Sequence, residues 1–575
     1  MLFIKPKEND EKKQLTETEI TISSIQPLVT DSSTTWLSEL GCHINDFYGI
    51  SIVENSANIS VVGTLQENSQ LYWYSNFQPS RTRGFLAHYN QKGDRVSAQI
   101  LNHGNDRLEL ASIITNNNDT FVSGVISDGT SNNGSIWAAK FNLAGDLLWA
   151  KELGGTWSNG FSSVHMTVLT KNHYAIISTS ENSGVYALPI YNLDDNGQIF
   201  WEVAIKNDLW QSMGAYAITS GGDNGETSII GWLNYDCGTK KCNTPFIALF
   251  SKEGELLNSK QFFLSTVDNY QKWGLTAIKS TYDHGYFAAG ANDCNINECL
   301  VTLRMNSNGQ PLSATQFFFD DADEIGIAAI ALATNANYAI VGKMYSGGAN
   351  VCLIGLVDDV GEPIWMTVIT HARGIVCIGI TNSRDGGFLI TGTAQEKAQK
   401  NPVYIASRAI TIKINSAGFA DLPSGFTYYN YTDKWHRQPL LVNGTDIVWT
   451  TESQPGNALD ITSSLSILNY ADFCTKPQTD YKLLGIFLSV LVTIALCRLG
   501  WQDEKRKVKA PWQDSTSDNP ATQQKKQSID SRKSSLSGGL FGRRYERFTR
   551  DTNRNHAGSD TLSIDPVIRG LSASK

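Results

Sequence analysis

A short turn that contains glycine recurs seven times in this chain, within a repeat of 50–61 residues. Glycine supplies the positive φ that a tight hairpin turn needs. The regular return of such a turn limits the chain to a repetitive, hairpin-rich architecture. The turns read NQKGD (90–94), NLAGD (142–146), DDNGQ (194–198), SKEGE (251–255), NSNGQ (306–310), DDVGE (358–362) and NSAGF (415–419).

Each repeat has the same plan. A short apolar strand such as AIALAT is followed by a tight polar turn and by a second strand that ends in glycine, as in YAIVGK. A variable loop, a third alternating strand, the glycine turn and a fourth strand complete the unit. Four short strands in a period of this length are typical of a β-propeller blade. We therefore predict an all-β propeller.

The number of blades follows from how the ends of the repeat region are assigned. Residues 437–473 contain three further strands and no fourth, and the opening stretch TTWLSELG resembles a fourth strand. We predict that the two form one composite blade, which closes the ring and leaves no open sheet edge. This predicts eight blades, with seven as the alternative. The seven full units begin near Tyr48, Leu108, Ser163, Gly214, Gly274, Ile325 and Gly374.

Three of the glycine turns are followed by tryptophan, at Trp149, Trp201 and Trp365. In this they resemble the propeller repeat of the quinoprotein-like superfamily, whose turn has the form D-x-x-G-x-x-x-W. The resemblance implies a propeller over roughly 36–473. The quinone-dependent dehydrogenases of that superfamily have an adjacent Cys–Cys pair over the cofactor, which this chain lacks. The resemblance thus implies the non-enzymatic binding and assembly branch, without a cofactor.

An apolar segment, YKLLGIFLSVLVTIALCRLGW, follows the repeats, and basic residues are concentrated on its C-terminal side. It predicts a transmembrane helix over 483–500, which would anchor the chain in membrane lipid, with a cytoplasmic tail and an exported propeller. A buried core helix is the alternative. The N-terminal sequence is not a secretory signal, so the export route is unexplained. The predicted organisation is 1–34 N-terminal segment, 35–475 propeller, 476–482 stalk, 483–500 helix and 501–575 basic disordered tail.

The chain has nine cysteines, and two pairs share one spacing: Cys237 with Cys242, and Cys294 with Cys299. We predict a disulfide within each pair, which implies an oxidising compartment and agrees with a propeller outside the cytoplasm. A metal half-site is the alternative. Cys474 is predicted to be a free thiol or to link two copies of the chain, not to bond to Cys42.

No sequence motif for catalysis is present, and the histidines of the repeat region occur singly. An acidic run could bind Ca²⁺, although a solvated loop is the simpler interpretation. Its residues are Asp320, Asp321, Asp323 and Glu324. The acidic repeat region, in a chain of net charge −9, also argues against nucleic acid as a partner.

Two insertions rich in aromatic residues are the best candidates for a binding surface, because exposed Tyr and Trp anchor protein interfaces and sugar platforms. The residues are Tyr72, Trp73, Tyr74 and Phe77 in one insertion, and Tyr428, Tyr429, Tyr431 and Trp435 in the other. We place both on the face of the variable loops, on the composite blade and its neighbour. Packing of these rings over the closure seam is the alternative.

We therefore expect a single-pass membrane protein whose propeller binds a protein or glycan, rather than an enzyme. The first alternative is a propeller hydrolase, lyase or cofactor-dependent oxidoreductase with its site on the axial channel. The second is a structural subunit of an envelope complex. Acids or histidines that converge on the axis would favour the enzyme.

Overall fold

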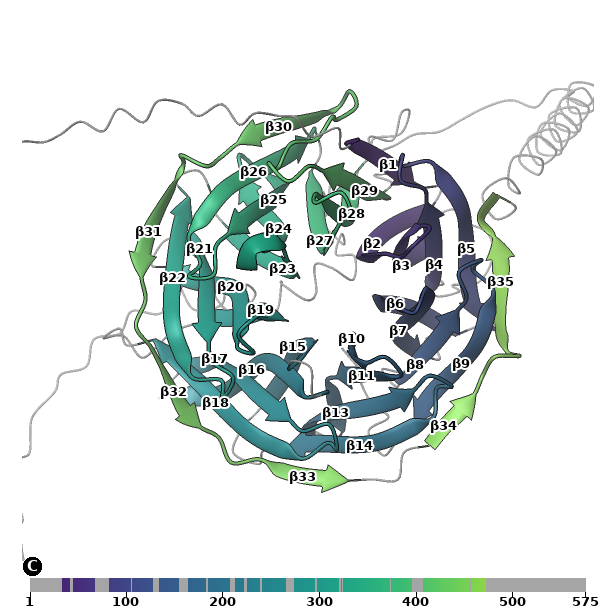
Figure 1. Cartoon of the computed structure of the whole chain (residues 1–575), viewed down its shortest axis with the longest axis horizontal. Coiled ribbons are helices and arrows are strands. Elements are labelled where there is room, and N and C mark those ends of the chain that lie inside the picture. The colour runs from purple at the N-terminus through teal and green to yellow at the C-terminus, as the bar shows by residue number, and fades with distance from the viewer. Residues whose placement is uncertain are drawn as a thin grey trace, which may run out of the picture. The chain divides into compact units, whose positions relative to one another are not determined.

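The computed structural model is a closed ring of β-sheets around a central axis (Figure 1). It describes residues 34–471 apart from short stretches, and all of these residues belong to one compact unit, Met1–Gly485. The stretches outside the description in that range are 42–44, 68–81, 105, 128–133, 155–163, 183–184, 207–211, 222–224, 238–239, 265–272, 295–296, 320–321, 323, 373, 396–406 and 454–456.

Seven sheets form the ring, so the eight-bladed prediction is wrong and the alternative of seven is correct. In each blade four antiparallel strands, called a to d, run from the axis outward. Blade 1 contains β2 (Asn45–Glu54), β3 (Ile59–Glu67), β4 (Thr82–Tyr89) and β5 (Arg95–His103). Blade 2 contains β6 (Arg107–Asn116), β7 (Asp119–Ser127), β8 (Gly134–Phe141) and β9 (Leu147–Gly154).

Blades 3 to 6 repeat this order. Blade 3 contains β10 (Val164–Thr170), β11 (His173–Ser178), β13 (Val185–Asp194) and β14 (Ile199–Lys206), with the short β12 (Ser180–Asn182) beside β13. Blade 4 contains β15 (Ser212–Ser220), β16 (Thr227–Cys237), β17 (Lys240–Phe250) and β18 (Leu256–Leu264). Blade 5 contains β19 (Trp273–Ser280), β20 (Tyr286–Cys294), β21 (Asn297–Met305) and β22 (Pro311–Phe319). Blade 6 contains β23 (Glu324–Leu332), β24 (Tyr338–Ser346), β25 (Ala349–Val357) and β26 (Pro363–His371), with a short 3₁₀ turn at Thr334–Ala336.

The two ends of the ring meet in blade 7. Its strands a to c are β27 (Ile375–Asn382), β28 (Phe388–Gln395) and β29 (Ser407–Ile414), and its strand d is β1 (Trp36–Leu40). The N-terminal strand does complete a blade, but that blade is the unit beginning near Gly374. The prediction that this strand pairs with 437–473 is wrong.

Residues 426–469 form a belt on the outside of the ring. Its six strands add one by one to the outer strands of blades 6, 5, 4, 3, 2 and 1, in the direction opposite to the order of the blades (Figure 1). The belt is therefore not a blade, and counting it as one gave eight. Its strands are β30 (Phe426–Asn430), β31 (Trp435–Pro439), β32 (Val442–Asp446), β33 (Thr450–Ser453), β34 (Asn457–Asp460) and β35 (Leu465–Asn469).

The glycine turns connect strands c and d in blades 1 to 6, and in blade 7 the turn 415–419 follows strand c and leads toward the belt. In the turn of blade 1, the Asn90 side-chain oxygen accepts hydrogen bonds from the backbone of Lys92 and Asp94, while Gly93 takes a φ of 83°. Asn142, Asp194, Ser251, Asn306, Asp358 and Asn415 occupy the same position in the other turns. A short polar side chain and a glycine thus fix each turn locally.

A second glycine, in the middle of strand b, has a different role. Gly290 pairs with Leu275, and a β-bulge follows at once, because the next pair is Ala289 with Ala277. A Cβ on Gly290 would lie 1.8 Å from the carbonyl oxygen of Gly274. Blades 1, 2, 4, 6 and 7 repeat this arrangement at Gly63, Gly124, Gly231, Gly342 and Gly392. In blade 3 the position is Ser178, and strand a has no bulge there. The glycine is what permits the bulge.

Tryptophan at the start of strand d binds one blade to the next. In four blades its indole N–H donates to a backbone carbonyl in the following glycine turn. The bond from Trp36 belongs to β1, so the closing strand contacts blade 1 as the other outer strands contact their neighbours. The four bonds run from Trp149 to Asp195 (3.0 Å), from Trp201 to Lys252 (2.8 Å), from Trp365 to Ser416 (3.1 Å) and from Trp36 to Gln91 (3.0 Å).

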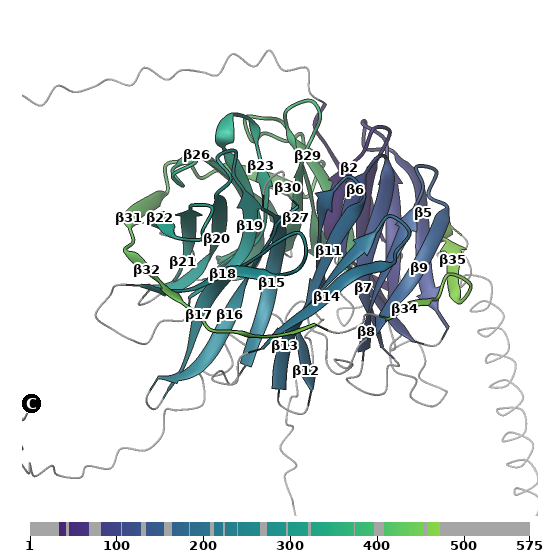
Figure 2. The same cartoon turned by 60° about the horizontal axis from the view of Figure 1, so that its bottom comes forward.

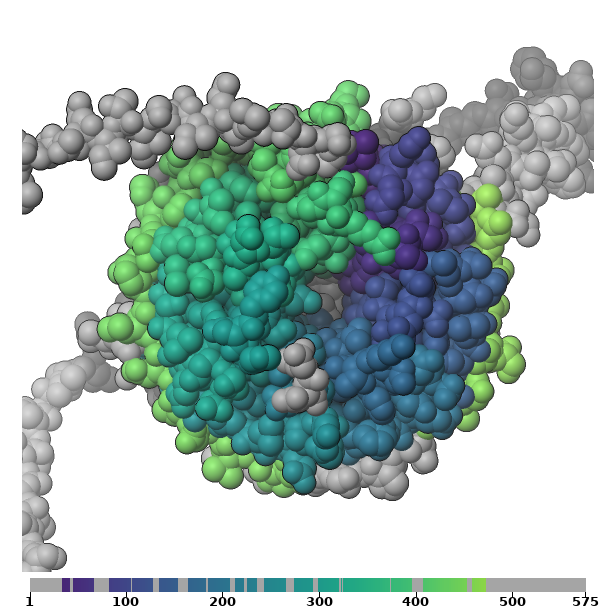
Figure 3. Space-filling model, viewed as in Figure 1, coloured from purple at the N-terminus to yellow at the C-terminus, as the bar shows by residue number. Residues whose placement is uncertain are grey.

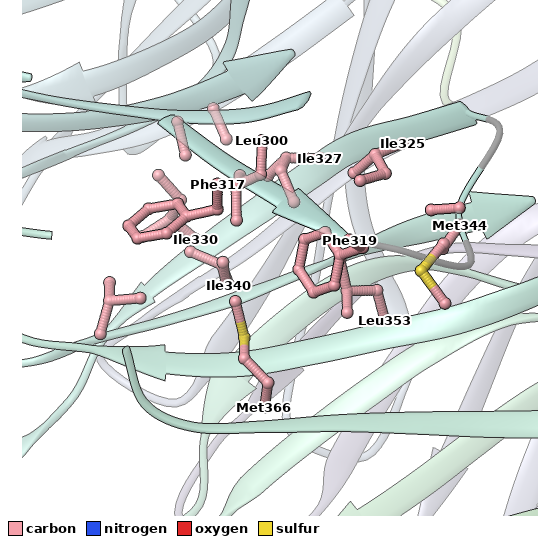
Figure 4. Close-up of a cluster of buried hydrophobic side chains, with 14 of the residues drawn as sticks. Leu300, Phe317, Phe319, Ile325, Ile327, Ile330, Ile340, Met344, Leu353 and Met366 are labelled. Carbon is pink, nitrogen blue, oxygen red and sulfur yellow. The ribbon is translucent and has the colours of Figure 1, made fainter. Parts of the chain in front are cut away.

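The core consists of apolar layers between neighbouring blades. Figure 4 shows one of them, in which Phe317 and Leu300 of blade 5 interlock with Ile327 and Ile340 of blade 6. A disulfide between Cys352 of β25 and Cys377 of β27 connects blades 6 and 7, and both residues are fully buried. Burial of these layers is the main stabilising contribution to the ring.

The predicted transmembrane helix is not part of this fold. No helix among the described residues is long and apolar enough to cross a membrane. Residues 483–500, the predicted 501–575 tail and the 476–482 stalk lie outside the described residues. The fold shown by the structure is all-β.

Candidate interaction surface

The belt covers only part of each outer strand. In β9, for example, the belt pairs with Lys151 to Gly154, whereas Leu147 and Trp149 pair with β8 on the inner side and Leu147 to Trp149 pair with no belt strand on the outer side within the described structure. The same division holds in blades 1 to 6. Each outer strand therefore has a covered half and a half that is open next to the c–d turn (Figure 2).

An exposed apolar side chain lies in each open half. It is always the third residue after the turn glycine and the third before the first residue that pairs with the belt. These side chains are between 46% and 63% exposed. We call them the rim residues: Val96, Leu148, Phe200, Leu257, Leu312 and Ile364.

Blade 7 breaks the rim. The corresponding residue of its outer strand is Thr35, whose hydroxyl accepts a hydrogen bond of 2.9 Å from the backbone of Asp421. The segment that leads from blade 7 into the belt thus covers this position. The rim is a property of blades 1 to 6 only.

Ion pairs between a buried cation and a more exposed carboxylate join the turns on the face that carries the rim. Lys140 of blade 2 contacts Asp119 at 3.0 Å in the a–b turn and Asp195 at 2.7 Å in the next blade. Burial alone would lower the pKa of Lys140, but its bonds to Asp195 and Asp119 outweigh burial and raise that pKa above its ordinary value. A basic residue of strand c meets an a–b turn carboxylate again at Arg304 with Asp283 and at Lys413 with Asp385. The turns are therefore fixed in position, and the rim is a rigid surface.

His88 and Glu202 are buried titratable groups outside these pairs. Burial lowers the pKa of His88 to about 4, and its Nδ1 lies 2.9 Å from the Ser60 hydroxyl. Burial raises the pKa of Glu202 to about 7, although a hydrogen bond with Tyr191 lowers it in part. His88 is on β4 and Glu202 on β14, so neither lies on an inner strand. They are parts of the blade packing.

The ring has a narrow opening at its middle (Figure 3). Among the residues that the structure describes, no group of three His, Cys, Asp or Glu side chains could hold a metal ion. Of the acidic run, Glu324 is described and pairs with Lys343. Asp320, Asp321 and Asp323 lie outside the described residues, so the Ca²⁺ site remains a prediction.

The second aromatic insertion is not one of the variable loops, where we predicted it, but the start of the belt. Tyr428 stacks on Phe419 with ring centroids 5.4 Å apart. Tyr431 is partly buried against the core, and Trp435 packs edge-on against Phe317 at 5.3 Å. Of the four, Tyr429 is the most open, at 49% exposed.

Three of these aromatic residues therefore pack within the fold at the start of the belt, on blades 6 and 5 and not over the closure seam of blade 7. The first insertion follows β3 of blade 1 in the sequence, and its aromatic residues lie outside the described residues: Tyr72, Trp73, Tyr74 and Phe77. Because blade 7 stands between blades 6 and 1, the two insertions are not on neighbouring blades. A binding role for either set remains a prediction.

The cysteines support an oxidised protein. Cys242 and Cys299 are disulfide-bonded and buried. The side chains of Cys237 and Cys294 lie outside the description, so the two predicted pairings remain predictions. The bond between Cys352 and Cys377 was not predicted, because 25 residues separate them and only the packing of two blades brings them together.

No protein-family model and no curated protein matches this sequence. Among solved structures, it is similar to the β-propeller domain of the Trilobed protease from Pyrococcus furiosus, at 10% identity and a TM-score of 0.35, over 66% of this chain and 99% of that chain. It is also similar to the polysaccharide lyase Uly1, at 10% identity and a TM-score of 0.39, over 64% and 90%. Likeness at this level says nothing about activity. The seven blades of the structure itself confirm the propeller fold that the quinoprotein-like resemblance implied.

Proposed function

We propose that this protein is a binding and assembly propeller that works outside the cytoplasm and engages a protein partner through the rim of blades 1 to 6. The observation that carries the proposal is the rim itself, an exposed apolar side chain beside an unpaired strand edge in one register, six times. Isolated exposed apolar residues are ordinary. An exposed apolar side chain beside an open strand edge, in contrast, is a common feature of protein interfaces. The blades of the propeller hold the rim residues in fixed positions.

Three further features support this proposal. The blade-to-blade disulfide Cys352–Cys377 requires an oxidising compartment, which favours a location outside the cytoplasm. The tryptophan contacts between blades fit the quinoprotein-like repeat, and we assign the chain to its non-enzymatic branch. The open strand edges favour a protein over a glycan, because backbone N–H and C=O groups there can pair with a partner strand.

Photo-crosslinking in cells that make the protein tests this proposal. A photoreactive residue replaces Leu257 or Leu312 of the rim, and Leu441 of the belt is the matched control, since it is 77% exposed and also apolar. We expect a discrete heavier adduct from the two rim positions and not from position 441. Equal adducts from all three positions, or none from the rim, would contradict the proposal.

The triple variant Phe200→Ser, Leu257→Ser, Leu312→Ser sharpens the test. Since these side chains are already about half exposed or more, the variant should unfold at nearly the same temperature as the natural protein. It should lose the adduct formed from position 148, on the neighbouring blade. An adduct that persists at full strength would show that the rim is not the contact surface.

A further inference from the structure

The six rim residues share a feature of the backbone. In each of blades 1 to 6 the rim residue is the extra residue of a β-bulge in strand d. In blade 2, for example, Trp149 pairs with Lys140 and Leu147 pairs with Phe141, so Leu148 between them pairs with no residue of β8. A bulge gives a side chain a direction that the regular alternation of a strand does not allow. The exposure of the rim residues is therefore built into the backbone of each blade.

A polar side chain accompanies each rim residue. The residue two positions before it directly follows the turn glycine, and it is always a carboxylate or a glutamine. The carboxylates are Asp94, Asp146, Glu255 and Glu362, in blades 1, 2, 4 and 6, and the glutamines are Gln198 and Gln310, in blades 3 and 5. An apolar group and an acidic group thus recur together around the ring.

The surface around the rim is acidic in blades 2 to 6. The glycine turns and the open halves of these blades hold eight carboxylates and one lysine. The stretches counted are 142–149, 194–201, 251–258, 306–313 and 358–365. In blade 1, Lys92 and Arg95 accompany Asp94, so the excess of negative charge belongs to blades 2 to 6.

The covered halves of the same strands have the opposite charge. Their residues that pair with the belt include three lysines and one carboxylate. The belt brings Asp460 to within 3.0 Å of Lys151, and Asp446 contacts Lys260. The segment that lies on the covered halves therefore carries charges complementary to those of the strands beneath it.

One carboxylate of the rim already contacts a basic side chain. Arg437 belongs to β31 on blade 5, and its guanidinium contacts Glu362 of blade 6. Glu362 directly follows its turn glycine, as Asp146 and Glu255 do in blades 2 and 4. Those two carboxylates have no ion pair with a residue that the structure describes. Arg437 therefore shows which kind of side chain this position accepts.

We propose that the partner presents basic residues beside apolar ones to blades 2 to 6. Its Lys or Arg side chains contact the carboxylates that follow the turn glycines, and its apolar side chains contact the rim residues. This inference rests on the proposed function and adds the chemistry of the partner.

Charge argues against two other occupants of the rim. An acidic segment, or the rim of a second copy of this chain, would bring carboxylate against carboxylate, which is unfavourable. The predicted link between two copies is a separate matter, because Cys474 and Cys42 both lie outside the described residues.

Two labelled peptides of about ten residues test this chemistry on the full chain by fluorescence anisotropy. One alternates Lys and Leu, and the other alternates Glu and Leu, so only the charge differs. We expect the Lys–Leu peptide to bind at least about tenfold more tightly, because like charges at an interface are costly. Its affinity should fall as the salt concentration rises. Equal affinity of the two peptides, or tighter binding of the Glu–Leu peptide, would overturn the proposal.

The triple variant Asp146→Asn, Glu255→Gln, Asp359→Asn locates the binding. All three side chains are exposed, and blades 3 and 5 already have glutamine at the position of Glu255. We expect the variant to bind the Lys–Leu peptide about fivefold more weakly, because three exposed ion pairs are lost. Unchanged binding would show that the rim is not the site.

The triple variant Asp433→Asn, Asp446→Asn, Asp460→Asn is the matched control. It removes the same charge from exposed positions of the belt. The affinity for the Lys–Leu peptide should stay within about twofold of that of the natural chain, because these carboxylates lie away from the rim. Equal weakening by the two triple variants would mean a general attraction to an acidic protein and would contradict the proposal.

The cross-linked adduct in cells separates this inference from the proposed function. A photoreactive residue at position 312 should give less adduct in the rim triple variant than in the belt control. The cross-linked segment, identified by mass spectrometry, should contain more Lys and Arg than Asp and Glu. A full-strength adduct with an acidic segment would overturn this inference and leave the proposed function standing. No adduct from the rim of the natural chain would overturn both.

Discussion

The strands of the blades and those of the belt differ in how far along the chain their partners lie. Within a blade, β20 pairs with its sequence neighbours β19 and β21. In the belt, β35 at Leu465–Asn469 pairs with β5 at Gln99–His103. Blade strands bury side chains between two sheets, whereas most side chains of β31 and β35 are exposed. The blades therefore carry the core, and the belt is an outer layer added to a ring that is already closed.

This difference predicts where substitutions should change the stability of the fold. Loss of a contact between blades leaves a cavity or a strained backbone in a packed layer, which is costly. Loss of a contact made by an exposed belt side chain, such as Tyr429, exposes groups that water can already reach. The same chemical change should therefore have a large effect in a blade and a small one in the belt.

The largest effect is expected at the closing strand. Trp36→Ala removes a buried indole that packs on the c–d turn of blade 1 and donates to Gln91. We expect it to lower the free energy of unfolding by about 3–5 kcal/mol. Denaturant unfolding measures the change. Tyr429→Ala in the belt is the aromatic control, and an equal loss there would remove the distinction between blade and belt.

The bulge glycines allow a closer comparison with identical chemistry. Gly290→Ala places a methyl group against the Gly274 carbonyl, so the strand must shift, and we expect a loss of about 2–3 kcal/mol. In the belt, the nearest atom to a Cβ on Gly444 is Cδ of Pro311, at 3.3 Å. Gly444→Ala should cost less than about 0.5 kcal/mol. Denaturant unfolding of the two variants measures both losses of free energy. Losses of similar size would refute the role of the bulge.

Glu202 predicts how stability in a blade depends on pH. Its folded-state pKa of about 7 lies above the ordinary value of 4.5. The folded protein therefore holds a proton that the unfolded chain releases, and stability falls as the pH rises from 4.5 through 7. Glu202→Gln should match the natural protein near pH 4 and be more stable at pH 8, by about 2–3 kcal/mol. A variant that is less stable than the natural protein at pH 8 would contradict this assignment.

The smallest effect is expected for an ion pair of the belt. Asp446 of β32 contacts Lys260 of β18, but the side chain of Asp446 is 78% exposed. Such pairs contribute little, so Asp446→Asn should change the free energy of unfolding by less than about 1 kcal/mol. A loss of the size expected for Trp36→Ala would mean that the belt holds the ring together.

The sequence allowed the propeller to be predicted because its blades are local. Each glycine turn from NQKGD to NSAGF directly follows strand c of one blade, and the seven turns match the seven blades. The error came from residues 437–473, which read as strands but contain no such turn. Four- or five-residue strands with exposed side chains show no period that reveals their partners, and those partners lie up to hundreds of residues away.

The candidate site was predictable only in part. The rim residues follow each glycine at a fixed spacing, so the sequence does contain the pattern. Their exposure, however, depends on where the belt stops, which the sequence alone did not reveal. The aromatic residues Tyr428, Tyr431 and Trp435 were correctly identified as unusual, but their packing against the blades follows from the course of the belt. The disulfide Cys352–Cys377 likewise depends on packing between blades.

The central claim is that the belt runs around the ring against the order of the blades, and zero-length carbodiimide cross-linking of the natural protein tests it most directly. The reagent joins a lysine to a carboxylate only when the two are in contact. Lys151 lies 3.0 Å from Asp460, and Lys260 contacts Asp446. We predict cross-links Lys151–Asp460 and Lys260–Asp446, in which the earlier lysine takes the later carboxylate. Links in the opposite combination, or no link from either carboxylate to the blades, would contradict the account.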